Sequence, residues 1–507
     1  MPKVSVKVKW GKETYPGVEV NTEDDPVVFK AQIFALTGVQ PERQKVVCKG
    51  VTLRDDSWAN FKLTNNALVL VMGSKEEDVP SAPVEKTKFV EDMNESELAT
   101  ALDLPEGLIN LGNTCYMNAT VQCLKTVPEL KNALLSYDKS SGGGTAGELT
   151  SALSETMGAL EGGGAGACAG AAARLLRALH ATAPRFAERA AGGGLAQQDA
   201  SECWAEIVRA LQQRLPAAPA SAPIDAAAVS DRTSVIEQYF GGTLDVELVC
   251  SEADESPSRS TESFLQLSCF ISQDVKYLQS GLRSKMSEQI TKMSQTLGRD
   301  AIYTKTSKIS RLPAYLTVQF VRFYYKEKES INAKILKDVK FPMDLDVYEL
   351  CSPELQERLT PMRTKFKELD DATVETSLSA RNKNHGDSKK ENKKKTVMPY
   401  WFENDVGSNN SGYYRLQAVL THRGRSSSSG HYVAWVARGD GWLRCDDDTV
   451  TPVTEEEVLK LSGGGDWHCA YLLLYGPRIL EIPEKDEEPM VTEVVDDTAG
   501  NPPTALA

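Results

Sequence analysis

The sequence predicts an α+β protein in which a small strand-rich domain precedes a larger mixed domain. Its 507 residues are enough for about two to four ordinary domains, and 41% hydrophobic with 25% charged residues is typical of globular chains. Strand-like alternation dominates residues 1–74, whereas residues 105–479 begin with helical patterns and end with strand patterns. That order favours an α+β domain over alternating βα units.

Residues 1–74 are expected to fold as ββαββ. Apolar and polar residues alternate in "VSVKVKW", which is the period of a half-buried strand. Phe29, Ile33 and Leu36 then follow helical spacing, and Gly38 is placed to end that helix. The order and length resemble a ubiquitin-like β-grasp domain. Because the chain continues past "VLVMG" without a terminal Gly-Gly pair, we expect a docking module rather than a protein modifier.

Composition marks out four further segments. Residues 75–104 are polar and charged, which predicts a flexible linker. Residues 140–196 are rich in Gly and Ala and are expected to be partly helical. Residues 381–395 form a basic low-complexity loop, which we interpret as a solvated, disordered insertion, and residues 480–507 form an acidic tail that we expect to be disordered.

Charge and cysteine usage restrict the functional class. The net charge of −14 argues against nucleic acid as the main ligand and is compatible with a basic partner. The N-terminus lacks the apolar region of a signal peptide, and the longest apolar runs are too short for membrane insertion. Ten scattered cysteines indicate free thiols in a reducing compartment, so we expect a cytoplasmic location that extends to the nucleus.

Cys115 is the strongest candidate for chemistry. It follows the loop "GLINLGNT" and begins an apolar helical pattern, with Asn113 or Thr114 as the N-cap. A thiol in a first helical turn faces the positive end of the helix dipole, which stabilises its thiolate. The alternative is a buried structural cysteine, and Cys123 fits that description well.

A cysteine nucleophile requires a base, and the chain has five histidines. His431 ranks first because it begins the alternating strand "HYVAWV", and a tight turn then leads into "WLRCDDD". Antiparallel pairing of this hairpin would return Asp446 and Asp447 to the level of His431, where a carboxylate can orient the imidazole. His468 ranks second, and His422 is expected at the edge of the loop "THRGRSSSSG".

These stretches together resemble the ubiquitin-specific proteases. "GLINLGNTCYMNATVQCL" is similar to the cysteine box of that family, and "GHYVAWV" with "WLRCDDDTV" is similar to its histidine box. "QQDASE", "RLPAYLTVQFVRF" and "KDVKFPMDLD" match further boxes in the same order. The resemblance implies a papain-like catalytic domain over residues 105–479 with fingers, palm and thumb regions. The N-terminal ubiquitin-like domain resembles that of proteasome-associated members.

The resemblance also assigns roles to individual residues. It implies that Cys115 is the nucleophile, His431 the general base, Asp446 the orienting carboxylate and Asn110 an oxyanion donor, with Asp447 as the alternative acid. Asp199 matches a carboxylate that binds the basic tail of ubiquitin, although the sequence also permits a helix N-terminal acid there. The remaining residues expected to contact substrate are Gln198, Ser428, Ser429 and Gly430. The "GRSSSSG" segment is expected to block the tail groove until the proteasome is bound.

The resemblance implies hydrolysis of the isopeptide bond between ubiquitin and substrate lysines, with trimming of ubiquitin chains and recycling of ubiquitin. The expected partners are ubiquitin and the 26S proteasome regulatory particle, and the free protein is expected to be a monomer. Because Cys-x-x-Cys pairs are absent, we expect no zinc and no cofactor. Two alternatives remain: a non-catalytic ubiquitin-binding regulator that delays degradation, and a protease for another ubiquitin-like modifier.

Overall fold

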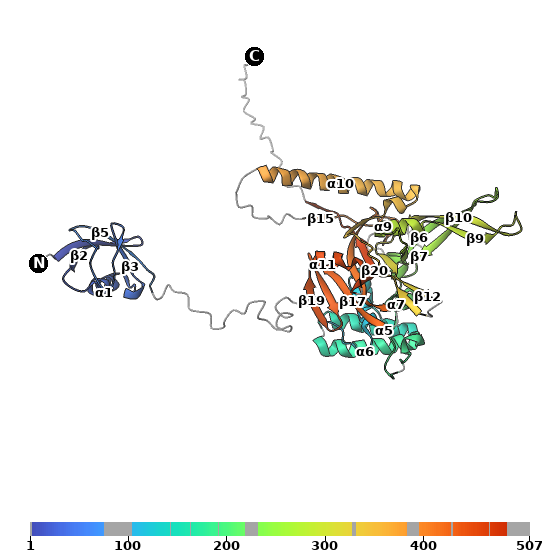
Figure 1. Cartoon of the computed structure of the whole chain (residues 1–507), viewed down its shortest axis with the longest axis horizontal. Helices are drawn as coiled ribbons and strands as arrows, with labels where there is room; N and C mark the ends of the chain where they lie inside the picture. The colour runs from blue at the N-terminus through green and yellow to red at the C-terminus, as the bar shows by residue number, and fades with distance from the viewer. Residues whose placement is uncertain are drawn as a thin grey trace, which may run out of the picture. The chain divides into compact units, whose positions relative to one another are not determined.

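The computed structural model describes residues 3–75, 104–141, 143–162, 164–190, 192–217, 232–326, 331–382, 395–426, 429–465 and 467–483. These residues form two units, and each is described by itself (Figure 1). Ser428 and most of the segments 75–104, 381–395 and 480–507 lie outside the described residues. In the described part of the chain, no helix has both the length and the apolar character needed to cross a membrane.

The N-terminal unit is a five-stranded sheet with one helix. The strand order is β2-β1-β5-β3-β4, and the central strands β1 and β5 are parallel. Its elements are β1 (Lys3–Trp10), β2 (Glu13–Asn21), α1 (Pro26–Thr37), β3 (Lys45–Cys48), β4 (Val51–Thr52) and β5 (Leu68–Met72). The β-grasp class agrees with the structure, whereas the predicted ββαββ order omits the two-residue strand β4, and the observed order is ββαβββ.

Helix α1 faces the sheet through residues one turn apart. Phe29 and Ile33 are buried as predicted, and Gly38 ends the helix in a left-handed conformation with φ of 73°. The prediction for Leu36 is wrong, because its side chain is 38% exposed. Thr37 takes its place four residues after Ile33, and its hydroxyl donates to the Ile33 carbonyl over 2.7 Å, so the buried polar group is satisfied.

The second unit begins with helices and ends with strands, as the sequence predicts. Its α-helices are α3 (Cys115–Lys125), α4 (Pro128–Leu135), α5 (Gly144–Leu160), α6 (Gly164–Thr182), α7 (Ala200–Arg214), α8 (Val235–Phe240), α9 (Leu278–Lys285), α10 (Pro353–Asn382) and α11 (Glu455–Leu459). The Gly/Ala-rich segment 140–196 thus contains two long helices, whose Ala and Leu residues are buried at Leu153, Ala172 and Leu179.

The main sheet of this unit has ten strands among the described residues. Its longest path is β19-β18-β17-β16-β20-β11-β8, with β12, β13 and β14 attached at its side. The strands are β8 (Leu267–Phe270), β11 (Leu316–Val321), β12 (Phe323–Lys326), β13 (Ile331–Lys334), β14 (Asp344–Asp346), β16 (Tyr413–Ser426), β17 (Ser429–Arg438), β18 (Gly441–Asp446), β19 (Thr449–Val453) and β20 (Cys469–Pro477).

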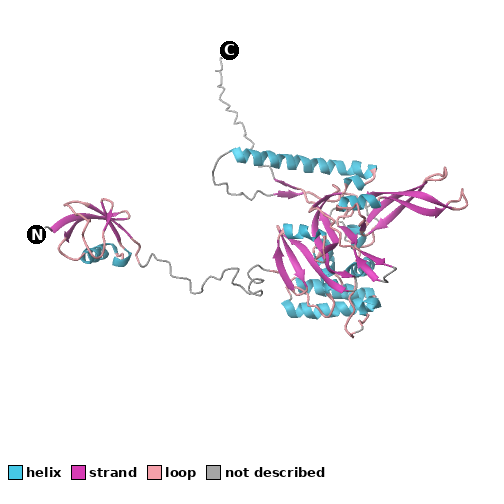
Figure 2. Ribbon diagram, in the orientation of Figure 1, coloured by secondary structure: helices cyan, strands magenta, loops and turns pink. Residues whose placement is uncertain are grey.

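The two faces of this sheet bury different cores. Along β17, Tyr432 and Ala434 lie in the core shared with α3, α5, α6 and α7, whereas Val433 and Trp435 lie in the core shared with α9 and the start of α10. Figure 2 shows helices on both sides of the strands. In a strand that is buried on both faces, polar residues do not alternate with apolar ones, because neither face meets solvent. This explains the continuous apolar runs "YVAWV" and "CAYLLLY".

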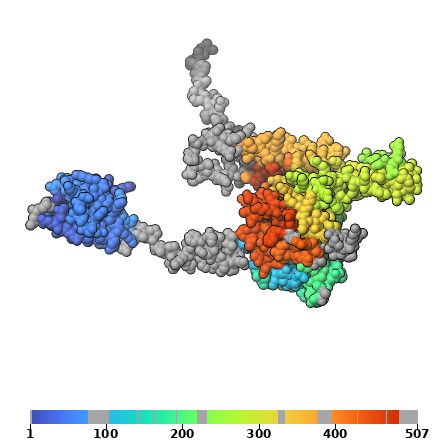
Figure 3. All heavy atoms as spheres, viewed as in Figure 1, coloured from blue at the N-terminus to red at the C-terminus, as the bar shows by residue number. Residues whose placement is uncertain are grey.

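A second sheet extends away from this core. It has the order β7-β6-β10-β9 and consists of β6 (Gly242–Cys250), β7 (Ser258–Phe264), β9 (Ser287–Met293) and β10 (Asp300–Arg311). The end formed by β9 and β10 stands clear of the rest of the unit in Figure 3. This projecting sheet occupies the place that the predicted fingers region would take.

Two predicted boundaries are wrong. Strand β15 (Lys395–Val397) pairs with β21 (Glu481–Pro483), although Lys395 ended the predicted disordered loop and residues 481–483 belonged to the predicted disordered tail. Lys395 and Glu481 form an ion pair of 2.9 Å across this pair. Helix α10 also continues to Asn382, into the predicted loop. The pairing joins segments 86 residues apart, which local composition does not encode.

Candidate active site

Cys115 is the first residue of α3, and its side chain is 3% exposed. Thr114 is the N-cap, but its hydroxyl accepts from the Leu111 N–H over 2.9 Å and makes no cap bond with α3 among the described residues. Gly112 and Asn113 have φ of 98° and 56°, so the approach to Cys115 uses two successive left-handed residues. The turn therefore fixes the thiol at the end of the helix that carries the positive dipole.

His431 lies on β17 and meets the other reactive groups. Its Nε2 is 2.6 Å from Asp446 Oδ1 on β18, and its ring also hydrogen bonds with the Cys115 thiol. Because Nε2 is taken by Asp446, Nδ1 is the nitrogen that remains for the thiol. The hydrogen bonds with Asp446 and then with Cys115 raise the pKa of His431 to about 10. The ring is therefore held in its charged form at neutral pH.

Asp446 reaches His431 diagonally across the hairpin. The register pairs Ala434 with Cys445, so Asp446 lies opposite Val433, on the same face as His431 and two residues along the strand. The hydrogen bond to His431 and a second bond from Arg444 hold the pKa of Asp446 well below its usual range. An ionised carboxylate at this position can both orient and stabilise an imidazolium.

Asp447 has a different partner from Asp446. It lies in a left-handed turn with φ of 54°, and its two carboxylate oxygens accept from Asn110 Nδ2 over 2.8 Å and from Asn118 Nδ2 over 2.9 Å. Its carbonyl accepts from the Leu108 N–H. Gly107 fits against this turn because a Cβ there would lie 2.5 Å from two carbonyl oxygens. Of the two acids that the sequence left open, Asp446 contacts the histidine, and Asp447 holds the loop before Cys115.

Asn110 is oriented by four bonds within the described residues, one of which its Oδ1 accepts from the Thr114 hydroxyl over 3.5 Å. Its Oδ1 accepts from the Gly112 and Thr114 N–H groups over 3.0 and 3.2 Å, and one N–H of its amide donates to Asp447. An amide carries two N–H groups, so one donor remains for a ligand. The backbone N–H of Cys115 is the first of its helix and has no acceptor within α3.

The two other histidines of this region are buried in the main sheet. His468 is 4% exposed, its Nδ1 is 3.1 Å from Thr421 Oγ1, and burial lowers its pKa to about 4. His422 was expected at a loop edge, but β16 continues to Ser426 and buries its ring completely. Burial lowers the pKa of His422 to about 3. Burial therefore keeps both rings neutral at neutral pH, whereas the His431 ring is charged.

Asp199 has the helix-capping role, one of the two that the sequence left open. It is the N-cap of α7 and accepts from the Ser201 and Glu202 N–H groups over 2.8 and 3.1 Å. Its carboxylate also accepts from the Tyr471 hydroxyl, at 2.8 Å for Oδ2. The side chain remains partly exposed. Gln198, also predicted to bind substrate, instead donates to the Arg185 carbonyl over 3.0 Å.

Gly430 immediately precedes the candidate base and packs on His422. Its φ is 147°, and a Cβ there would overlap the His422 ring and the Arg423 carbonyl. Ser429 pairs with Ser426 across the β16–β17 hairpin. The predicted contact residue Ser428 lies outside the described residues, so its position is left as an expectation.

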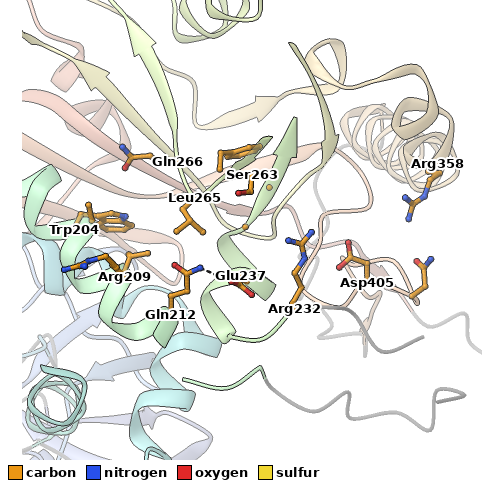
Figure 4. Close-up of a pocket in the computed structure, with 16 residues that line it drawn as sticks. Trp204, Arg209, Gln212, Arg232, Glu237, Ser263, Leu265, Gln266, Arg358 and Asp405 are labelled. Atoms are coloured by element: carbon orange, nitrogen blue, oxygen red, sulfur yellow. Dashed lines mark hydrogen bonds between the residues drawn. The ribbon is translucent and has the colours of Figure 1, made fainter. Parts of the chain in front are cut away.

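A hollow of about 1140 Å³ lies beside α7 (Figure 4). Trp204, Arg209 and Gln212 of α7 form one wall, and Phe264 and Gln266 at the base of the projecting sheet form another. Arg358 and Asp405 lie at its far side. Gln212 donates to Glu237 across the floor over 2.8 Å. Its volume lies slightly above the range of about 300–1,000 Å³ that is typical of small-ligand pockets, and charged and polar side chains form much of its lining.

One group among the described residues has metal-ligand spacing. Ligand atoms of His431, Asp446 and Asp447 lie within 4.8 Å of one another. The oxygens of Asp446 and Asp447 already accept from His431, Arg444, Asn110 and Asn118. The three side chains are thus satisfied by protein donors, and their arrangement is that of a hydrogen-bonded acid–base pair with a neighbouring loop anchor.

Sequence reasoning missed Asp447 as a loop anchor, Tyr471 as the partner of Asp199, and Arg444 as the second partner of Asp446. The first two contacts join residues 337 and 272 positions apart, for which a single sequence carries no signal. The sequence did contain a signal for Arg444, because side chains two positions apart on a strand lie on the same face of the sheet.

The profile of the family described as "Ubiquitin carboxyl-terminal hydrolase" matches residues 106–475. The chain is 41% identical to ubiquitin carboxyl-terminal hydrolase 14 of Caenorhabditis elegans, over 97% of this chain and 98% of that protein. It is 40% identical to ubiquitin carboxyl-terminal hydrolase 6 of Arabidopsis thaliana, over 95% and 100% of the two chains.

Among solved structures, the chain is similar to one described as the SAGA Ubp8/Sgf11/Sus1/Sgf73 DUB module bound to ubiquitin aldehyde. The TM-score is 0.50 at 22% identity, and the match covers 76% of this chain and 74% of that one. This likeness concerns the fold, and it agrees with the predicted catalytic-domain architecture.

Proposed function

The chain belongs to the ubiquitin carboxyl-terminal hydrolase family and is a cysteine-type deubiquitinase, and on this premise we propose how its residues carry the reaction. The scissile bond joins the C-terminal glycine of ubiquitin to a lysine of a substrate or of another ubiquitin. The observation that supports this most directly is the contact of His431 with both Cys115 and Asp446. This set supplies a nucleophile, a base and an orienting acid.

The reaction begins with the Cys115 thiolate, whose proton has passed to His431. The sulfur attacks the glycine carbonyl carbon, and the carbonyl oxygen becomes an oxyanion. His431 then gives its proton to the lysine amine, the C–N bond breaks, and ubiquitin remains attached to Cys115 as a thioester. His431 next takes a proton from water, which attacks the thioester and releases ubiquitin with a free carboxylate.

The oxyanion is bound by neutral donors that are already in place. The spare N–H of Asn110 and the N–H of Cys115 both lie at the start of α3, and Asp447 fixes the Asn110 amide. Donors held by the protein need no reorganisation as charge develops, which is the main advantage of such a site.

Ubiquitin binding is assigned to the surface that leads to Cys115. We place the basic ubiquitin tail beside Asp199, whose carboxylate is partly exposed although it also caps α7. The hollow beside α7 begins one turn farther along the same helix, at Trp204, and its size suits part of the folded ubiquitin. Substitution of Asp199 would raise KM and also weaken α7, so its kinetic effect requires a stability control.

The assignment of the nucleophile is tested with a ubiquitin probe that carries a C-terminal electrophile. We expect one adduct on the full-length chain and none on Cys115→Ala. Cys123→Ala is the matched control, because this thiol is fully buried eight residues farther along α3 and should leave the adduct unchanged. An adduct on Cys115→Ala would show that another thiol is the nucleophile, and no adduct on the unaltered chain would favour a non-catalytic ubiquitin-binding regulator.

We further propose that the N-terminal unit docks on the proteasome regulatory particle and that docking raises activity. The support is the ubiquitin-like order of its strands and the apolar face of β5, where Leu68, Leu70 and Met72 are 47%, 39% and 55% exposed. A cytoplasmic and nuclear location and a monomeric free state belong to the same proposal.

Docking is tested with a fluorogenic ubiquitin substrate and proteasomes whose own deubiquitinases are inactivated. We expect proteasomes to raise the rate for the unaltered chain but not for Leu70→Asp. Because Leu70 lies outside the second unit, the substitution should leave the rate of the free protein unchanged. Equal rates with and without proteasomes would contradict activation. Parallel assays with substrates made from other ubiquitin-like modifiers test the alternative that the protein is a protease for one of those modifiers.

A further inference from the structure

We propose that Arg444 is a positioning residue that fixes the plane of the Asp446 carboxylate and thereby the ring of His431. The proposal rests on the catalytic roles given above. Arg444 Nη2 binds Asp446 Oδ2, while Asp446 Oδ1 binds His431 Nε2 over 2.6 Å. The carboxylate is thus engaged through both oxygens, one by a fixed cation and one by the reacting ring.

The β-strand explains why Arg444 and Asp446 meet. They are two residues apart on β18, so their side chains leave the same face of the sheet. The rotation of an aspartate about its terminal bond is soft, and a single hydrogen bond to His431 leaves the second oxygen free to turn. A guanidinium on that second oxygen removes the freedom, and its planar N–H groups have fixed directions.

Arg444 is itself held by its neighbour across the hairpin. The register pairs Arg444 with Trp435 of β17, and the guanidinium carbon lies 5.9 Å from the centre of the indole ring. Its Nε is buried and has no hydrogen-bond partner among the described residues. The arginine is therefore oriented by stacking and by Asp446, not by a wider network of ion pairs.

The indole is anchored in turn by buried polar groups. Trp435 Nε1 donates to Thr421 Oγ1 over 3.0 Å, and the Thr421 hydroxyl can give its single proton to the Val433 carbonyl over 3.2 Å. His468 Nδ1, 3.1 Å from the same oxygen, then acts as a donor, which assigns the proton of the neutral ring to Nδ1. His468 is thus a structural support for Trp435 rather than a second base.

Electrostatics agree with this arrangement. Arg444 contributes to the low pKa of Asp446, after the hydrogen bond to His431, and it helps burial to keep His468 neutral. Burial comes first among the causes for His468, and Arg423 adds to it. Arg444 therefore favours both the charged form of Asp446 and the neutral form of His468.

The expected signature is a fall in kcat without a change in KM. Arg444 contacts Asp446 and Trp435 and is not assigned to the ubiquitin surface, so its loss should leave substrate binding intact. Misplacement of a catalytic group by about 1 Å can cost up to roughly a hundredfold in rate, and we expect about tenfold for Arg444→Met. Arg444→Lys keeps the charge and one donor, and we expect about half of the lost rate to return on a logarithmic scale.

The experiment is a double-mutant cycle with Asp446→Asn, measured with a fluorogenic ubiquitin substrate on the full-length chain. If Arg444 acts through Asp446, Arg444→Met should lower kcat about tenfold in the unaltered chain and less than twofold in the Asp446→Asn background. Arg438→Met is the matched control, because it removes the same charge at the opposite end of the β17–β18 hairpin. We expect it to change kcat less than twofold.

Thiolate absorbance near 240 nm, compared with Cys115→Ala, gives a readout that loss of hairpin stability would not imitate. It should fall in Arg444→Met and recover in Arg444→Lys, with thermal unfolding used to show that both variants are folded. Additive losses in the cycle, or an unchanged kcat in folded Arg444→Met, would overturn the inference. An unchanged kcat in Asp446→Asn alone would instead overturn the proposed catalytic role of Asp446, so the two failures are distinguishable.

Discussion

Replacement of Asp446 by Asn should move the alkaline limit of activity to lower pH. The pKa of His431 rises from 6.5 to about 10, and the hydrogen bond with Asp446 is the largest cause. That rise corresponds to roughly 5 kcal/mol of preference for the charged ring. The Cys115 thiol is the next contributor, so about half of this preference is assigned to Asp446 on an order-of-magnitude basis.

The sign follows from the direction of the shift. A ring with a raised pKa stays protonated until the pH passes the raised value, so the His431 ring of the unaltered chain stays charged to about pH 10. Loss of about 2 kcal/mol should bring the alkaline limb down by about 1.5 to 2 pH units, to roughly pH 8 to 8.5, and lower kcat/KM at pH 8.5 about two- to fourfold. The same linkage makes the contribution of His431 to stability complete below pH 6.5 and lost as the pH rises through about 10.

The assay is the pH profile of kcat/KM with a fluorogenic ubiquitin substrate, together with the rate of Cys115 alkylation by iodoacetamide. Asp448→Asn is the matched control, because it makes the same chemical change two residues farther on, at an exposed position. It should reproduce the profile of the unaltered chain. An alkaline limb in Asp446→Asn that coincides with that of Asp448→Asn would refute the assignment of the His431 pKa to Asp446.

Three further substitutions have effects that the structure specifies. Asp447→Ala removes the acceptor of the Asn110 amide, and we expect kcat to fall about tenfold or more while the ubiquitin-probe adduct still forms slowly, as single-turnover kinetics would show. Gly430→Ala places a Cβ against the His422 ring at a φ of 147°, and should destabilise the second unit by about 2 kcal/mol or more in urea unfolding; a neutral effect would mean that the strand can shift. Glu129→Leu removes the carboxylate that accepts from the hydroxyls of Tyr315 and Tyr400, so we expect the second unit to lose about 1–3 kcal/mol of stability and to unfold several degrees lower; an unchanged melting temperature would contradict a role for this contact in holding α4.

The parts of the fold that the sequence predicted are those with a local period. The β-grasp unit follows from alternation in β1 and from one helical stripe. Its two errors are the short strand β4, which was not predicted, and Leu36, which lies on the exposed side of the helix. The start of α3 at Cys115 could also be predicted from neighbouring residues, because the loop and the first helical turn are adjacent in the sequence. The loop assigned to "THRGRSSSSG" was wrong because Gly and Ser were read as a turn, whereas pairing with β17 extends β16 to Ser426.

The geometry of the site could be predicted only in part from residues that are neighbours in the sequence. A hairpin reading placed two carboxylates near His431 but could not choose between them, since one residue of register reverses the face of a side chain. In the observed register, Asp446 hydrogen bonds with His431, and Asp447 accepts a hydrogen bond from Asn110. Asp199 likewise had two readings from its sequence, and its contact with Tyr471 comes from a strand 272 residues away.

By itself, the sequence determined the class of the protein, its two units and the residue types of the site, because strand and helix periods and short motifs are properties of neighbouring residues. Only the tertiary structure decided which aspartate faces His431, that His422 and His468 are buried and neutral, and that Arg444 and Trp435 support the carboxylate. These facts depend on register, burial and contacts between distant strands. They are set when the whole sheet closes over its two cores, and no local pattern contains them.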